Sequence, residues 1–324
     1  MENKFENRVD LTELATHIAE VKTEIGKYIK GQPQLLDLLL VAILADGHVL
    51  IEGVPGVAKT LTAKLLAKTI EASFKRIQFT PDLMPSDIIG TSIFNSKSHD
   101  FEFKRGPLFA NIVLADEINR SPAKTQAALF EAMEERQITV DGTTHKLELP
   151  FIVLATQNPI EQEGTYRLPE AQLDRFIFKI AVGYPAMEDE TEMLSNMQAN
   201  SHVIDFTKVK SFLSKEGIIK LKALVQKVVV EENLIKYIIQ LVASTRKNPS
   251  LYLGASPRAS IAILNAAKAT AAIQNRDFVT PDDIKYVTTP VLRHRVALTP
   301  EKEMEGIQVD TVIQQLIDKI EVPR

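Results

Sequence analysis

The stretch HVLIEGVPGVAKTLTAKLLAKTI, residues 48 to 70, decides the predicted fold. It opens with HVLIE, a short apolar run typical of a buried strand, and it ends with LTAKLLAKTI, which reads as a helix. A loop with two glycines joins them. A loop that leaves a strand and opens a helix is the context in which a phosphate loop works, so the stretch predicts a site for a phosphorylated ligand.

The loop from Gly53 to Thr60 offers three kinds of phosphate-binding group. Backbone N–H groups surround phosphate oxygens, Lys59 reaches the β and γ phosphates, and Thr60 places its hydroxyl on Mg²⁺. We therefore predict ATP and Mg²⁺ as cofactors. The residues expected to contact the nucleotide are Gly53, Val54, Pro55, Gly56, Val57, Ala58, Lys59, Thr60 and Leu61. The alternative is a strand-to-helix turn that binds no ligand.

Ala58 stands where the general phosphate-loop pattern has glycine. A Cβ is penalised strongly only at positive φ. Alanine is therefore tolerated at this position if the residue has the helical, negative φ.

Two adjacent acids, Asp116 and Glu117, end the apolar run IVLA of residues 112 to 115. A buried strand delivers them to the carboxyl edge of the sheet. At that edge Asp116 can hold Mg²⁺, while Glu117 is free to turn toward the nucleotide and activate water. The alternative is a pair of solvated acids at a strand end.

Five apolar runs indicate a buried parallel sheet. They are HVLIEG (48–53), FKRIQF (74–79), NIVLAD (111–116), FIVLAT (151–156) and RFIFKI (175–180). Because the runs are apolar on both faces and alternate with helical patterns, they predict a three-layer α/β core with the sheet between helices.

The pattern changes after Gly183-Tyr184-Pro185. No comparable strand is predicted beyond this point, and segments such as LIKYIIQLVAST have helical periodicity. We predict an α/β nucleotide-binding domain over residues 1–184 and a helical domain over residues 185–324.

Two inserts interrupt the first domain, near residues 80–105 and 136–150. In the second insert, alternating runs flank Asp141-Gly142, which predicts a hairpin with a tight turn. Three helix starts are also predicted, each with a capping residue followed by proline: Ser121-Pro122, Ser256-Pro257 and Thr280-Pro281.

The composition excludes several classes of protein. A net charge of -4 and a pI near 6.0 argue against a general nucleic-acid binder. The absence of cysteine excludes disulfides and thiolate chemistry. No apolar segment approaches the roughly 20 residues that span a bilayer, and the polar start does not resemble a signal peptide. We predict a cytoplasmic protein with no membrane span.

Asn158 follows the fourth apolar run in the sequence ATQNP, residues 155 to 159. On the carboxyl edge of the sheet its amide could position the attacking water or touch the γ phosphate. Asparagine before proline is also a common turn, and the residues alone leave both readings open.

Several motifs in order resemble one family closely. They are GVPGVAKT, GPLFANIVLADEINRSPAKTQAALFEAMEERQITVDG, ATQNPIEQEGTYRLPEAQLDRF, LGASPRA and VTPDDI with VLRHR. Together they cover nearly the whole chain, which looks like a MoxR-type AAA+ ATPase. The resemblance implies a P-loop AAA+ core with a parallel sheet between helices, followed by a small all-helical lid. Alanine before the loop lysine is usual in that family, whereas Arg167 stands where proline is expected.

The resemblance also implies roles for further residues. Asn158 matches the sensor-1 position, Arg175 the arginine finger and Arg258 sensor 2. Arg175 would act on ATP held by a neighbouring subunit, so the active unit would be a homo-oligomeric ring, usually a hexamer in this family. The stretch that lines the adenine pocket is matched by Ile29, Gly31 and Gln32. The alternatives for an interface arginine are Arg105, Arg120 and Arg167.

The leading function is a ring-forming ATPase that remodels or matures a partner protein, which in this family often carries a von Willebrand factor A domain. That partner is expected to be a separate chain, because no DxSxS metal-site sequence occurs here. The alternatives are a chelatase-like motor subunit for metal insertion and a nucleotide-gated binding module. A helicase fits the hairpin but not the acidic charge, and a small-molecule kinase lacks a recognisable acceptor site.

Overall fold

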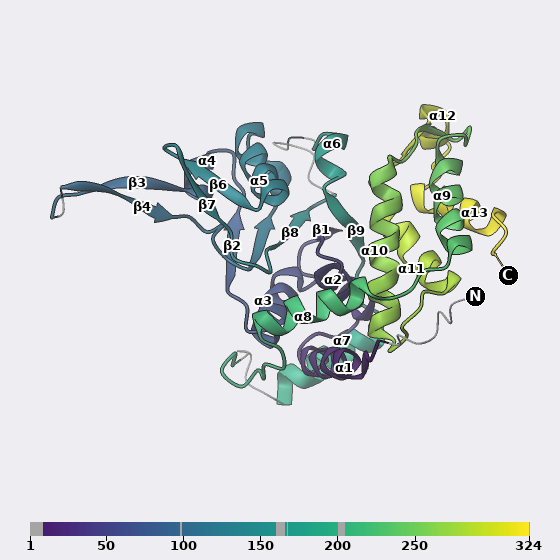
Figure 1. Ribbon diagram of the computed structural model, residues 1–324, viewed down its shortest axis with the longest axis horizontal. Coiled ribbons are helices and arrows are strands. Elements are labelled where there is room, and N and C mark those ends of the chain that lie inside the picture. Colours follow the sequence, from purple (N-terminus) through teal and green to yellow (C-terminus); the bar gives the residue numbers. More distant parts are fainter. Residues whose placement is uncertain (1–8, 98, 160–165, 167, 200–204, 324) are drawn as a thin grey trace, which may run out of the picture.

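The core of the chain is a five-stranded parallel sheet (Figure 1). The computed structural model describes residues 9–97, 99–159, 166, 168–199 and 205–323. The strand order is β2-β5-β8-β1-β9, and every neighbouring pair is parallel. The strands are β1 (His48–Gly53), β2 (Phe74–Gln78), β5 (Ile112–Asp116), β8 (Ile152–Gln157) and β9 (Phe176–Val182). All five predicted runs form strands, and the α/β prediction is confirmed.

Alternate residues of the central strands enter two different hydrophobic cores. In β5, Ile112 and Leu114 belong to one core, and Val113 and Ala115 belong to the other. The helices α1 (Thr12–Gly26), α2 (Pro33–Leu44) and α3 (Lys59–Thr69) contribute to the first core, whereas α4 (Pro85–Ile89) and α5 (Ala123–Glu135) contribute to the second. Burial on both faces explains why these strands lack the alternation of apolar and polar residues typical of a half-exposed sheet.

The two inserts form antiparallel hairpins. The predicted hairpin consists of β6 (Gln137–Val140) and β7 (Thr143–Lys146), and the turn residues Asp141 and Gly142 both have positive φ, as a tight hairpin turn requires. The insert near residues 80–105 contains a second hairpin that the sequence analysis did not predict, formed by β3 (Gly90–Asn95) and β4 (Asp100–Arg105). It projects away from the sheet in Figure 1.

Beyond the sheet the chain is mainly helical. The short helix α6 (Glu170–Leu173) precedes β9, and the helices after the sheet are α7 (Met187–Ala199), α8 (Lys215–Gln226), α9 (Glu232–Thr245), α10 (Pro257–Ile273), α11 (Pro281–Leu292), α12 (Pro300–Met304) and α13 (Val309–Lys319). Two short strands in this part, β10 (Leu251–Leu253) and β11 (Ala297–Leu298), pair with each other, and both are shorter than the strands of the sheet. The boundary after residue 184 stays a prediction, because one hydrophobic core includes residues on both sides of it.

Two of the three predicted helix starts are confirmed. Ser256 caps α10 by accepting the N–H of Arg258, and Thr280 forms a capping box with Asp283 at the start of α11. The prediction for Ser121 was wrong. Helix α5 begins one residue later than expected, with Pro122 at the cap position, and the buried Ser121 hydroxyl has no hydrogen-bond partner among the described residues.

Among the described residues, no helix has the length and apolar character needed to cross a membrane.

His48 connects three elements inside the α/β core. Its Nδ1 accepts the Val153 N–H of β8 at 3.0 Å, so Nε2 carries the proton and donates to the Met133 carbonyl oxygen of α5 at 3.2 Å. The bond from Val153 requires the neutral ring, because Nδ1 can accept a hydrogen bond only when it carries no proton. Burial lowers the pKa of His48 from 6.5 to about 4.

We predict that His48 makes the fold acid-sensitive. Between pH 6.5 and 4 the unfolded chain binds a proton that the folded chain does not, so the free energy of unfolding falls as the pH falls. The full loss attributable to His48 is about 3 kcal/mol. Urea unfolding at pH 7 and pH 4.5 measures it. His48→Asn should flatten the pH dependence, whereas His17→Asn on α1 should leave it unchanged; equal slopes for the wild type and His48→Asn would contradict the prediction.

Candidate functional site

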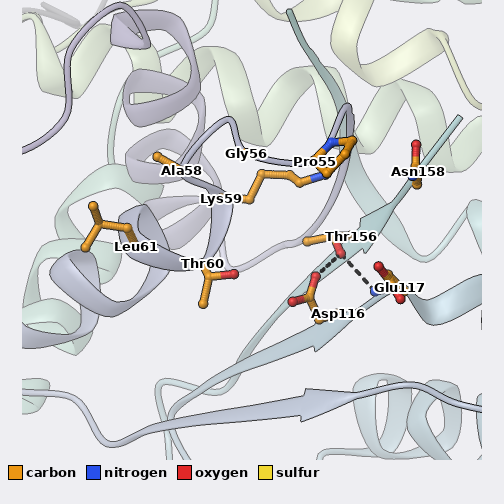
Figure 2. Close-up of a pocket in the computed structure, with 10 residues that line it drawn as sticks. All are labelled: Pro55, Gly56, Ala58, Lys59, Thr60, Leu61, Asp116, Glu117, Thr156 and Asn158. Atoms are coloured by element: carbon orange, nitrogen blue, oxygen red, sulfur yellow. Dashed lines mark hydrogen bonds between the residues drawn. The ribbon is translucent and has the colours of Figure 1, made fainter. Parts of the chain in front are cut away.

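A pocket of about 350 Å³ lies at the carboxyl edge of the sheet, next to the start of α3 (Figure 2). Three strands, β1, β5 and β8, end there. The pocket is lined by Pro55, Gly56, Ala58, Lys59, Thr60, Leu61, Asp116, Glu117, Thr156 and Asn158. Nine of these ten residues were predicted to belong to the site, and the tenth, Thr156, was not.

The loop between β1 and α3 turns through two residues with positive φ, Gly56 at 87° and Ala58 at 57°. The condition under which alanine would be tolerated at position 58, a helical negative φ, is therefore not met. A left-handed conformation costs a residue with a Cβ about 1 to 2 kcal/mol. Ala58 lies directly before the first residue of α3, where the chain must reverse to start the helix.

Lys59 is the first residue of α3, and its ammonium donates to the Gly53 carbonyl oxygen at 2.6 Å. Burial lowers the pKa of Lys59, while the charges of Asp116 and Glu117 act in the opposite direction. The ammonium thus lies between the loop and the two acids. The first N–H groups of a helix have no intrahelical acceptor, so the start of α3 also offers donors to an anion.

Asp116 is mostly buried, with 9% of its surface exposed, and both of its carboxylate oxygens have partners. Oδ1 accepts the Thr156 hydroxyl at 2.5 Å. Oδ2 accepts Nε and Nη2 of Arg76 at 2.9 and 2.7 Å. These bonds fix the plane of the carboxylate at the end of β5.

Glu117 has a left-handed backbone, with φ 56° and ψ 50°, and its N–H donates to the Thr156 hydroxyl oxygen at 2.9 Å. This conformation turns the chain after β5, so the adjacent residues Asp116 and Glu117 can both line the same pocket. The Glu117 carboxylate accepts Gln78 Nε2 at 2.8 Å and lies 3.3 Å from Arg120 Nη1. Strained residues of this kind cluster at functional sites.

Three partners of the acids, namely Arg76, Gln78 and Thr156, were missed by the sequence analysis. Two of these partners, Arg76 and Gln78, come from β2, and the register of that strand places Gln78 opposite Asp116. A signal existed in FKRIQF, because polar residues at alternate positions of a strand lie on one face. Their distance of about forty residues from the acids hid the contact.

The donor set fits Mg²⁺. The Thr60 hydroxyl faces the Asp116 carboxylate across the pocket, as Figure 2 shows, and hard oxygen ligands of this type suit Mg²⁺ in phosphate sites. The positively charged Lys59, which could pair with phosphate, lines the same cavity.

Asn158 lines the same pocket and is 9% exposed. Of the other loop residues, Gly53 ends β1 and Val57 is buried in the hydrophobic core, while Val54 packs against that core. These three residues belong to the loop but are not among the residues that line the cavity.

The arginines predicted to act on the nucleotide lie elsewhere. Arg175 Nε is 3.1 Å from Glu134 Oε2, and Arg258 Nη2 donates to Glu134 Oε1 at 3.2 Å. Both therefore meet one carboxylate near the end of α5, and neither lines the phosphate pocket. The Arg258 guanidinium, in the first turn of α10, thus has the Glu134 carboxylate as its partner.

The alternative interface arginines have different surroundings. Arg120 pairs with Glu117, and the Arg105 guanidinium lies over the Phe109 ring at 5.2 Å. Arg167 lies outside the described residues.

The stretch expected to line the adenine pocket lies beside the chain that follows β9. Gln32 donates from Nε2 to the Gly183 carbonyl oxygen at 3.1 Å. Gly31 has φ 72°, and a Cβ there would come within 2.8 Å of Pro185. Ile29 is buried in the hydrophobic core. These residues are not among those lining the phosphate pocket.

Comparisons with known proteins agree with this architecture. The sequence matches the model of the ATPase family associated with various cellular activities over residues 48–178, and that of the AAA lid domain over residues 243–316. The uncharacterized protein YeaC of Bacillus subtilis is 50% identical over 299 residues, which are 92% of each chain. Chaperone MoxR1 of Mycobacterium tuberculosis is 44% identical over 93% of this chain and 81% of its own length.

A solved structure has the same fold along the whole chain. The crystal structure of a candidate ATPase from Cytophaga hutchinsonii superposes with a TM-score of 0.90 at 45% identity, covering 97% of each chain. Since the identity to relatives spans both the sheet and the C-terminal helices, this chain belongs to the MoxR-type AAA+ ATPases.

Proposed function

We propose that the protein hydrolyses ATP with Mg²⁺ at the pocket between α3, β5 and β8, and that a ring of its copies uses this reaction to remodel a partner protein. The observation that carries the proposal is the meeting of Lys59, Thr60, Asp116 and Glu117 around one cavity. Membership of a family of ATPases supports the same reading.

In the proposed site the loop N–H groups and Lys59 bind the phosphates, and Thr60 and Asp116 hold Mg²⁺. Mg²⁺ held by these residues would supply positive charge that offsets the negative charge developing during phosphoryl transfer. Thr156 orients Asp116 through the hydroxyl bond at 2.5 Å, and it fixes the start of the Glu117 turn through the bond at 2.9 Å.

Glu117 is proposed to accept the proton of the attacking water, with Asn158 as a second polar group toward the γ phosphate. Its carboxylate is held between Gln78 and Arg120. These partners leave the carboxylate about one-third exposed, at 30%, so it remains accessible from the cavity.

A ring is proposed because the arginines lie outside the pocket of their own chain. Arg175 and Arg258 face Glu134 instead of the phosphate loop. As an arginine finger, Arg175 would complete the site of a neighbouring copy, and Arg258 would serve as sensor 2. A hexamer is the proposed ring size.

Further parts of the proposal follow from the family resemblance. The client is a separate protein with a von Willebrand factor A domain, and Ile29, Gly31 and Gln32 border the adenine. The nucleotide-binding domain spans residues 1–184 and the lid spans residues 185–324. The cytoplasmic location predicted from the sequence also remains a prediction.

We predict that two variants separate nucleotide binding from hydrolysis. Lys59→Ala removes a charged partner of the phosphates worth about 1.5 to 3 kcal/mol, and should weaken ATP binding about 10- to 100-fold. Glu117→Gln should bind ATP normally and lose about 10²- to 10⁴-fold in hydrolysis, since it cannot accept a proton. Titration with a fluorescent ATP analogue measures binding, and phosphate release measures turnover.

The matched control is Lys68→Ala, an exposed lysine in the last turn of the same helix, which should change neither quantity. Wild-type turnover by Glu117→Gln would remove Glu117 from the role of base. Wild-type ATP affinity of Lys59→Ala would remove the loop from the role of phosphate site.

We predict that two inactive variants complement each other in a mixed ring. Arg175→Ala should bind ATP but hydrolyse it about 10³- to 10⁵-fold more slowly, because an arginine finger contributes that factor. Mixed with Lys59→Ala, it forms interfaces that pair an intact loop with an intact finger, so ATPase activity should return. A mixture that stays inactive despite verified co-assembly would show that the site is complete in one chain or that another arginine is the finger.

We predict that Glu117→Gln captures the client in the presence of ATP. A variant that binds ATP without hydrolysing it should hold the remodelling complex, whereas Lys59→Ala should not. An affinity pull-down followed by mass spectrometry identifies the captured protein. Equal capture by both variants, or capture that ignores ATP, would argue for a partner that binds independently of the ATPase cycle.

A further inference from the structure

Arg295 is a buried arginine whose guanidinium donates to one short segment and to the end of the preceding helix, α11. Only 6% of its surface is exposed. Nε donates to Asp174 Oδ1 at 2.6 Å, and Nη2 donates to the backbone oxygens of Asp174 and Phe176 at 3.1 and 2.6 Å. Nη1 donates to the backbone oxygens of Ile177 and Val291.

These bonds hold residues 174 to 177, which run from the end of α6 into the first two residues of β9. The other Asp174 oxygen accepts the Ser256 hydroxyl at 3.1 Å, and Ser256 is the cap of α10. Asp174 is therefore bound from two places in the C-terminal helical part: Arg295 just after α11, and the first turn of α10.

Arg175 lies between the two backbone oxygens that Nη2 of Arg295 binds. Its own side chain points elsewhere, toward Glu134 and over the Phe130 ring at 5.8 Å. It lines a second pocket of about 240 Å³ formed mainly by α5, and it is 30% exposed. The base of the Arg175 side chain is thus fixed from inside the protein, and its charged end is accessible.

We infer that Arg295 is a positioning residue for Arg175, holding residues 174 to 176 so that the Arg175 guanidinium is presented to a nucleotide bound by a second copy. The inference deepens the proposed function and rests on it. Arg295 itself does not touch the nucleotide in this scheme. The VLRHR motif at residues 291 to 295 then has a role in the reaction as well as in packing.

Geometry favours positioning over simple stabilisation. A buried ion pair is weak support for stability, because the loss of hydration offsets the attraction between the charges. What an arginine adds is direction, since its donors form a rigid planar fork. Here the fork fixes the positions of the Asp174 and Phe176 carbonyl groups, the residues that flank Arg175 in the chain.

Arg293 offers a matched control two residues away. It pairs with Asp310 at 2.6 Å and donates to the Lys179 backbone oxygen at 2.8 Å. It thus ties the same turn to β9 by a similar charged clamp, yet none of these bonds reaches residues 174 to 177. A loss caused by general loosening of this turn would appear in Arg293→Lys as well.

The test adds Arg295→Lys to one or the other of the two variants that form the mixed ring; these two versions of the experiment are its two arms. The base mixture combines Lys59→Ala, which donates only a finger, with Arg175→Ala, which offers only a loop. Adding Arg295→Lys to the finger donor should lower the restored ATPase activity about 10- to 100-fold, as expected for a misplaced catalytic group. Adding it to the loop partner should change activity less than about twofold, and ATP affinity of Arg295→Lys itself should stay at the wild-type value.

Equal losses in both arms, or no loss in the donor arm, would overturn the inference. Arg293→Lys should leave both arms unchanged, and a donor-arm loss equal to that of Arg295→Lys would also overturn it. Should the melting temperature show that Arg295→Lys does not fold, Asp174→Asn decides instead, because it keeps the size of the side chain and removes the charge bound by Arg295. A base mixture without activity would overturn the proposed ring, and the inference with it.

Discussion

The hydroxyl of Thr156 is the contact on which the geometry of the site depends. It donates to Asp116 Oδ1 and accepts the N–H of Glu117, so one oxygen at the end of β8 fixes both acids at the end of β5. The contact exists because β5 and β8 are adjacent and parallel, with Ala115 opposite Ala155. The next strand in the order, β1, then delivers the loop and Lys59 to the same edge. A sheet with another strand order would carry the same residues and no common pocket.

Two residues with a strained backbone lie where these elements meet. Ala58 and Glu117 both have left-handed conformations, one before α3 and one after β5. Each such residue costs about 1 to 3 kcal/mol, and it persists only where the surrounding structure determines it. The surroundings here are the buried strands and the helix α3, whose inner residues Leu65 and Leu66 are fully buried. The stability of the three-layer core thus maintains two unfavourable turns, and both lie against the phosphate pocket.

Local patterns predicted the strands, the Asp141-Gly142 hairpin, the loop and the acidic pair, because each depends on neighbours in the sequence. Other features depend on what meets in space. The conformation of Ala58 follows from the angle at which α3 leaves β1, and the failure of Ser121 to cap α5 follows from a one-residue difference in where that helix begins. The partners of the acids were hidden because Arg76 and Asp116 are joined by strand pairing over forty positions. The sequence likewise did not reveal that Arg175 and Arg258 both pair with the Glu134 carboxylate, because the three residues lie far apart in the chain.

The backbone and the guanidinium of Arg175 are held with different strength. This difference matters for which anion pairs with the guanidinium. Its backbone lies between groups bound by the buried Arg295, where removal of one partner would leave a charge uncompensated. Its guanidinium pairs with Glu134 at a site where both side chains are at least 30% exposed. Pairs of that kind contribute about 0 to 1 kcal/mol. A phosphate carries more negative charge than a carboxylate and can accept the same planar fork of donors. A side chain fixed at its base and weakly held at its tip is suited to binding an anion that arrives from outside the chain.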